Sequence, residues 1–120
     1  MMNLKEEVLA IIEEQGGIDE QKTFMEDVME YGCISGTVGQ LIYYTDTVAF
    51  YDRHSVEIGD MLTDLMDDMG IYEPSELFNN WEENDDSILE FEDKINQNTL
   101  AWFGFEEMTR EIYEEMYGAY

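Results

Sequence analysis

The sequence predicts an all-α fold, a single compact domain of five to seven helices that spans residues 1–120. Apolar residues recur every three or four positions over most of the chain, which is the spacing of one face of an α-helix. The one proline, Pro74, leaves long stretches free to be helical. A chain of 120 residues has the length of one domain and buries enough surface to form a core without disulfides.

Two helices are predicted before residue 32, on either side of the pair Gly16-Gly17. Asn3 is a suitable N-cap for the first, and Glu6 three residues later completes a capping-box-like pattern. The apolar face of this helix is formed by Leu4, Val8, Ile11 and Ile12. Asp19 is predicted to cap the second helix, which ends at Gly32. Its apolar face is formed by Phe24, Met25, Val28 and Tyr31.

The middle of the chain is predicted to hold several shorter helices. A third helix would place Val38, Leu41 and Ile42 inward, and the aromatic segment 43–51 is interpreted as helical although it is rich in β-formers. Ser55 is predicted to cap a helix that ends at Gly70, and a short helix is predicted from Pro74 to about Asn80. The apolar stripe of the Ser55 helix is formed by Ile58, Met61, Leu62, Leu65 and Met69, with Asp60, Asp64, Asp67 and Asp68 on the opposite face.

The clearest helical pattern is the last one, which Gly118 closes. Its apolar positions are Ala101, Phe105, Met108, Ile112 and Met116. Glu106, Arg110 and Glu114 are predicted to form a charge ladder on another face, because residues four apart are neighbours on a helix.

Charge restricts the partners of this chain. It carries 30 acidic residues against 5 basic ones, a net charge of −25. Binding to nucleic acid or to an anionic membrane surface needs lysines and arginines, so neither is expected. The sequence also lacks an apolar run of membrane-spanning length and a signal-peptide pattern, which predicts a protein of the cytoplasm.

Catalytic and metal-binding residues are sparse, so the chain is not expected to be an enzyme or to carry a cofactor. One cysteine, Cys33, and one histidine, His54, are too few for a structural zinc site. His54 is interpreted as a solvent-facing or capping residue. No glycine follows acids at the spacing of an EF-hand loop. An all-carboxylate Mg²⁺ or Ca²⁺ site that the fold assembles stays open as an alternative.

Recognition is the remaining class of function. Phe50, Trp102, Phe103 and Phe105 are assigned to the core. Tyrosines and tryptophans beside acids are typical anchors of protein interfaces. The candidate partner-binding residues are Tyr43, Tyr44, Asp46, Asp52, Tyr72, Trp81, Glu82, Glu83, Asp85, Asp86 and Tyr117.

Three stretches, Gly32–Val38, Leu41–Tyr51 and Asn98–Glu107, resemble a family of small acidic proteins of phages and other mobile elements that is described as a domain of unknown function. The resemblance runs from about Phe24 to Tyr117. The chain departs from the family between residues 70 and 97, where it is longer and more acidic.

Within this family the chain is most similar to the anti-defence proteins of SPβ-type phages, which inhibit a defence-associated sirtuin. The resemblance implies a stoichiometric inhibitor in the host cytoplasm. Its partner would be a large bacterial NADase with a Sir2 domain. The inhibitor would prevent a phage tail protein from activating this NADase, so that NAD survives. The family supplies no catalytic residues.

A second hypothesis is a DNA mimic that blocks a nuclease or another nucleic-acid-binding defence protein, as anti-CRISPR and anti-restriction proteins do. Mimicry needs rows of acids, because duplex DNA carries one charge per roughly 1.7 Å of its axis. The acidic run from Glu82 to Asp93 and the last helix are the candidate rows.

Overall fold

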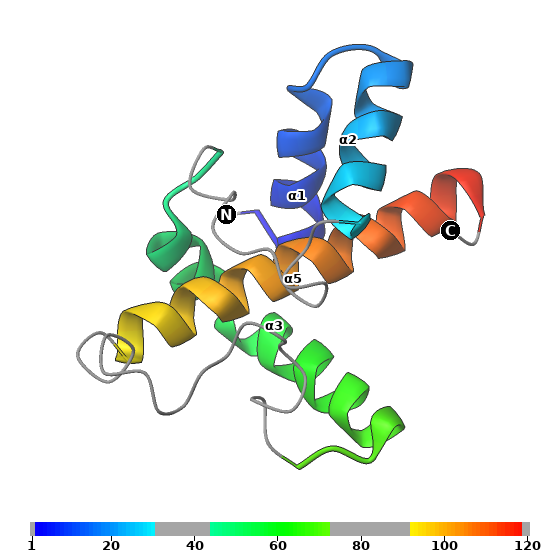
Figure 1. Cartoon of the computed structure of the whole chain (residues 1–120). Helices are drawn as coiled ribbons and strands as arrows, with labels where there is room; N and C mark the ends of the chain where they lie inside the picture. The colour runs from blue at the N-terminus through cyan, green and yellow to red at the C-terminus, as the bar shows by residue number, and fades with distance from the viewer. Residues whose placement is uncertain (1, 31–43, 73–91, 119–120) are drawn as a thin grey trace.

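The structure, a computed structural model, describes residues 2–30, 44–72 and 92–118, with the side chains of 92–99 left out. These residues form four helices: α1 (Leu4–Glu13), α2 (Ile18–Glu30), α3 (Thr47–Met69) and α5 (Glu92–Tyr117). The part of the chain described here contains no strand, which confirms the all-α prediction. α5 runs through the middle, between the α1–α2 hairpin and the second half of α3 (Figure 1).

α5 is buried on every side over its central turns. Six consecutive residues, Ala101–Glu106, are buried, although a surface helix exposes one face. This burial follows from its neighbours, because α1, α2 and α3 all pack against α5. The four aromatic residues assigned to the core, Phe50, Trp102, Phe103 and Phe105, are each at most 2% exposed, as predicted.

The backbone of α5 is approached closely by a side chain of α3 where the two helices pack together. A Cβ atom added to Gly104 would lie only 2.7 Å from Cδ1 of Ile58, closer than real Cβ atoms come to a neighbour. A glycine is therefore required at this point of α5 even though it lowers helix propensity. The packing of α3 on α5 is the most extensive contact between helices.

Three helix ends and one apolar face follow the predicted signals. Asn3 caps α1 by accepting a hydrogen bond from the backbone N–H of Glu6 (2.8 Å). Gly70 ends α3 in the left-handed region, with φ 69°. Gly118 follows the end of α5 with φ 90°. The apolar face predicted for α1 is buried at all four positions.

Other boundaries correct the prediction. Ser55 does not cap a helix but lies inside α3, which Asp46 caps through the N–H of Ala49 (3.1 Å). The helix predicted to start at Ser55 and the end of segment 43–51 are thus one helix with a kink at His54. Asp19 lies in the first turn of α2 rather than at its cap, because α2 begins at Ile18.

The described residues hold four helices, fewer than the predicted five to seven, because two predicted segments merge in α3. Two further predicted helices, with Val38–Ile42 and Pro74–Asn80, lie outside the described residues. α5 begins at Glu92, earlier than the clear apolar pattern indicates. Met69 and Met116, predicted on apolar stripes, are 56% and 49% exposed because each lies in the last turn of its helix.

We predict that Gly104→Ala destabilises the protein. Overpacking costs about 1–3 kcal/mol, which exceeds the gain of about 1 kcal/mol from removing a helical glycine. The free energy of unfolding from urea titrations measures this. The matched control is Gly59→Ala in α3, where no atom lies within 4 Å of the added Cβ, so this variant should be more stable than the parent. Equal effects of the two substitutions would contradict the close crossing.

Candidate functional site

The surface combines exposed acids with cations that are already engaged. Each cation whose side chain is described lies against a partner within the chain. These contacts join Lys5 to Glu115 (2.7 Å), Arg53 to Glu7 (2.7 Å), Arg110 to Glu107 (3.7 Å) and Lys22 to the ring of Tyr117 (5.1 Å). The hydrogen bond that Lys5 donates to the carboxylate of Glu115 raises the pKa of Lys5. The exposed acids therefore face solvent with few cations left to neutralise them.

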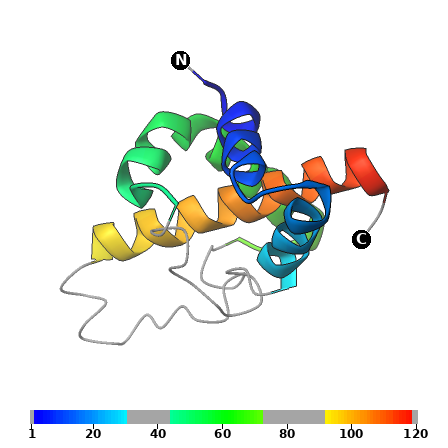
Figure 2. The same ribbon diagram turned by 90° about the horizontal axis from the view of Figure 1, so that it is seen from above.

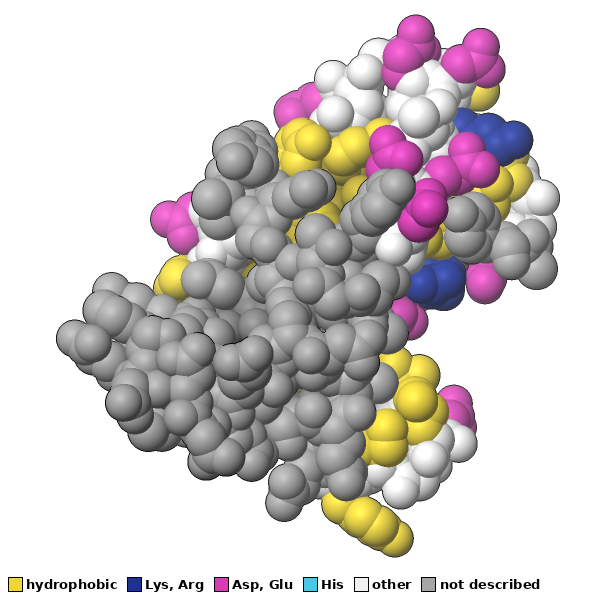
Figure 3. Space-filling view, in the orientation of Figure 1, with side chains coloured by type: hydrophobic (Ala, Val, Ile, Leu, Met, Phe, Trp, Pro, Cys, Tyr) yellow, Lys and Arg dark blue, Asp and Glu magenta, His cyan; other side chains and the backbone are white. Residues whose placement is uncertain are grey.

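Four aspartates of α3 show this surplus most clearly, and two of them, Asp64 and Asp68, line a hollow between α3 and α5. Asp60, Asp64, Asp67 and Asp68 are exposed, as predicted from their positions opposite the apolar stripe. Among the described side chains, none makes a hydrogen bond or ion pair with these four carboxylates. On the face seen in Figure 3, acidic side chains likewise surround hydrophobic ones over α1 and α2.

Three of the predicted interface tyrosines lie on the surface. Tyr72 is 91% exposed, Tyr44 is 42% exposed and Tyr117 is 37% exposed. The ring of Tyr44 packs edge-on against Phe24, with the ring centres 5.3 Å apart. The ring of Tyr117 packs on Tyr113 at 5.0 Å. Tyr44 and Tyr117 thus combine exposed area with a fixed ring, a property of interface anchors.

The other candidates divide into two groups. Asp52 is exposed on α3, whereas Asp46 is occupied as the cap of that helix. The candidates outside the described residues are Tyr43, Trp81, Glu82, Glu83, Asp85 and Asp86. The structure therefore places Tyr44, Asp46 and Asp52 near the start of α3 and Tyr117 at the end of α5.

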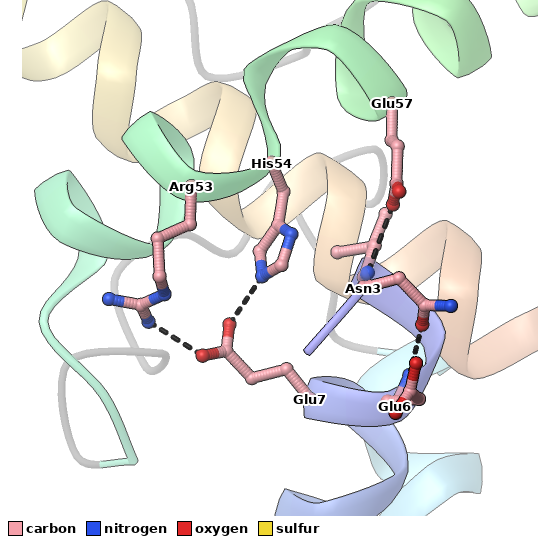
Figure 4. Close-up of polar contacts among 7 residues, drawn as sticks. Asn3, Glu6, Glu7, Arg53, His54 and Glu57 are labelled. Carbon is pink, nitrogen blue, oxygen red and sulfur yellow. Dashed lines mark hydrogen bonds and ion pairs between the residues drawn. The ribbon is translucent and has the colours of Figure 1, made fainter. Parts of the chain in front are cut away.

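A polar cluster between α1 and α3 corrects the interpretation of His54. This residue is 3% exposed, and its Nε2 lies 2.7 Å from Oε2 of Glu7 (Figure 4). Oε1 of the same carboxylate accepts a hydrogen bond from Arg53 (2.7 Å). The ring of His54 also packs edge-on against Phe50, with the ring centres 5.1 Å apart. His54 is therefore a buried residue that connects α3 to α1, and it does not face solvent.

The same seam holds the first turn of α1. The backbone N–H of Leu4 donates to Oε2 of Glu57 in α3 (3.0 Å), so a side chain of α3 satisfies a free donor at the start of α1. Figure 2 shows the first half of α3 beside α1. The Glu7–His54 contact joins residues 47 positions apart. No local sequence pattern reveals such a pair, which is why sequence analysis missed it.

The predicted charge ladder on α5 is confirmed at its first pair, because Arg110 lies 3.9 Å from Glu106, which is fully buried. Among the described side chains no ion pair joins Arg110 to Glu114, the second pair of the predicted ladder. Arg110 is closer to Glu107, at 3.7 Å. Burial raises the pKa of the Glu107 carboxyl, and the nearby Arg110 only partly offsets this.

No group of three or more metal-ligating side chains occurs within residues 2–30, 44–72 and 100–118. None of the described helices has an apolar stretch that would span a membrane. Fold and surface together define a small all-helical protein with an acidic surface that carries fixed, exposed tyrosines.

Residues 3–117 match the model of DUF7222, a domain of unknown function, and the chain belongs to this family. The match agrees with the expected membership of a family of unknown function, and the family's description names no phage, defence system or sirtuin. No curated protein and no solved structure matches the chain.

We predict that Glu7→Ala lowers the free energy of unfolding by about 1–3 kcal/mol, because it leaves a buried polar atom of His54 without its partner. Urea unfolding followed by the fluorescence of buried Trp102 measures the loss. Glu6→Ala is the control, since Glu6 is exposed in the same helical turn and its loss should cost only a few tenths of a kcal/mol. Glu7→Gln, which keeps an acceptor, should lose less than Glu7→Ala. An equal loss in the Glu6 and Glu7 variants would contradict a stabilising contact between Glu7 and His54.

We predict that Glu107→Gln is more stable than the parent at pH 7, with the difference shrinking as the pH falls. Burial raises the pKa of Glu107 in the folded state. As the pH rises, this carboxyl therefore ionises first in the unfolded chain, which lowers the free energy of unfolding until the pH exceeds the folded-state pKa. A neutral amide removes this penalty. Unfolding midpoints between pH 4 and 7 test the trend, and Glu111→Gln, the same change at an exposed position of α5, is the control variant. A constant difference would contradict the assignment.

Proposed function

We propose that this protein is a phage-encoded stoichiometric inhibitor that binds a bacterial Sir2-domain NADase in the host cytoplasm. By binding, it prevents activation of the NADase and the loss of NAD. The inhibitor carries out no catalysis, so its surface alone determines what it does.

The observation that carries this proposal is the one-sided charge of the surface. The cations with described side chains are paired within the chain, while exposed acids of α2 and α3 have no partner among the described residues. Such a surface attracts a basic partner over several ångströms and repels nucleic acid and other acidic proteins. Charge of this kind mainly speeds encounter and selects partners, while apolar anchors supply affinity.

The choice of target rests on the resemblance. Its last stretch, Asn98–Glu107, contributes the buried centre of α5, and its second stretch contributes Phe50 to the same core. The resemblance is therefore strongest in residues that build the fold. A shared fold does not by itself imply a shared function, so the residues that contact the target have to be found on the surface.

One observation favours the alternative, a DNA mimic that inhibits a nuclease or another nucleic-acid-binding defence protein. Asp60, Asp64, Asp67 and Asp68 lie on one exposed face of α3. The helix rises 1.5 Å per residue, so these four charges span about 12 Å. A single DNA strand carries about four phosphates over the same length, at roughly 3.4 Å each.

We predict that the purified chain protects NAD in a mixture of the Sir2-domain NADase and the phage tail protein that activates it. Protection should be complete at about one chain per NADase subunit, because a stoichiometric inhibitor acts only while bound. The NAD concentration is measured against the molar ratio, and size-exclusion chromatography detects the complex.

Two results would contradict the proposal. Protection far below equimolar ratio would indicate a catalytic mode of action. Absence of both complex and protection, together with displacement of labelled duplex DNA from a nuclease, would favour the DNA mimic. A mixture with the NADase alone, without the tail protein, is the control for direct effects on NAD.

A further inference from the structure

A groove beside α2 is the surface feature that the proposed function leaves unassigned. It has a volume of about 390 Å³, which lies in the range of sites that hold a side chain or a small ligand. Its described lining residues are Gln15, Asp19, Glu20, Thr23, Phe24 and Asp27.

One side chain that lines the groove is the aromatic ring of Phe24, which packs against the core. Phe24 is partly buried and packs edge-on against Tyr44 at 5.3 Å and against Phe105 at 6.2 Å, both at 76°. Phe105 belongs to the buried centre of α5. Phe24 therefore keeps one orientation while part of it stays accessible, and the exposed Tyr44 extends the aromatic surface beside it.

The charges around this ring are all negative. Glu20 and Asp27 lie four residues before and three residues after Phe24 on α2, the two spacings at which helical side chains are neighbours. Neither carboxylate, nor that of Asp19, pairs with a described cation. The one lysine of α2, Lys22, lies against the ring of Tyr117 instead.

Two glycines in the turn before α2 leave space for the side chain of Glu20. A Cβ on Gly17 would lie 3.0 Å from Oε2 of Glu20, and a Cβ on Gly16 would lie 3.3 Å from the Cβ of Glu20. Gly16 also has φ 129°, which side chains rarely adopt. Gln15 donates its amide N–H to the carbonyl of Ile11 (2.9 Å), so its carbonyl oxygen remains as an acceptor at the groove.

We propose that this groove is the docking site for an arginine side chain of the target protein. A guanidinium group stacks on an aromatic face, donates five hydrogen bonds in a plane and is weakly hydrated, so it fits the ring of Phe24 between carboxylates. A lysine ammonium is a compact, strongly hydrated charge and gains less from the ring. This inference rests on the proposed function for the identity of the protein that carries the arginine.

The test in the complex uses two variants with the same change in charge. Glu20→Gln with Asp27→Asn neutralises the groove, and Asp60→Asn with Asp64→Asn neutralises two exposed acids of α3. We expect the groove variant to bind the purified NADase at least tenfold more weakly than the parent, and the α3 variant less than threefold. Circular dichroism melting confirms that both are folded. Equal losses, or no loss in the groove variant, would overturn the proposal.

A second measurement does not depend on the NADase. The full chain is titrated with N-acetyl-arginine amide and with N-acetyl-lysine amide, and its backbone amide signals are followed by NMR. We expect the largest shifts at Thr23, Phe24 and Asp27, at least threefold larger with arginine than with lysine, and lost in the groove variant. Equal shifts with both probes, or shifts centred on α3, would overturn the arginine site.

The two measurements separate the two proposals. If the arginine probe binds in the groove and the NADase does not bind the chain, the proposed target is wrong and the arginine site stands. If the NADase binds and the groove variant binds equally well, the function stands and the groove is not its docking site. A dimer in sedimentation that only the groove variant loses would make a second copy the occupant and would overturn the proposal.

Discussion

The crossing of α3 over α5 at Gly104 is the contact on which the rest of the structure depends. It lets Ile58 approach the backbone of α5, and this close approach leaves α5 without a solvent face over its central turns. The α1–α2 hairpin then packs on the same stretch of α5 from another side. Trp102, Phe103 and Phe105 can all be buried because α5 is enclosed at this point, and the rings of Trp102 and Phe105 stack on each other with their centres 5.6 Å apart.

Most of the described cations lie where helices meet around this core. Three of the four described cations bridge different helices: Lys5 joins α1 to α5, Arg53 joins α3 to α1, and Lys22 joins α2 to α5. Exposed ion pairs stabilise a protein only slightly. In a chain with a net charge of −25, they also relieve repulsion at the seams between helices.

The sequence was most informative where a local pattern determines structure. The apolar faces of α1 and α5, the cap at Asn3 and the stop at Gly70 follow from neighbouring residues and were predicted. Prediction failed where distant residues decide. Ser55 is a suitable cap by itself, but the contact of His54 with Glu7 keeps that segment inside a kinked helix. The exposure of Tyr44 was expected, whereas the groove at Phe24 depends on α5 and a turn that no spacing reveals.

Specific recognition by such a protein needs more than its charge. A surface with 30 acids attracts any basic surface, and exposed charges more than about 8 Å apart are screened from one another at physiological salt. Discrimination therefore has to come from a place with a fixed shape, where a wrong side chain leaves carboxylates desolvated and unpaired. The groove at Phe24 meets this condition, because its ring is anchored in the core while Glu20 and Asp27 stand beside it. In the proposed complex, the acids elsewhere would speed the encounter with the partner, and the groove would determine how long the partner stays bound.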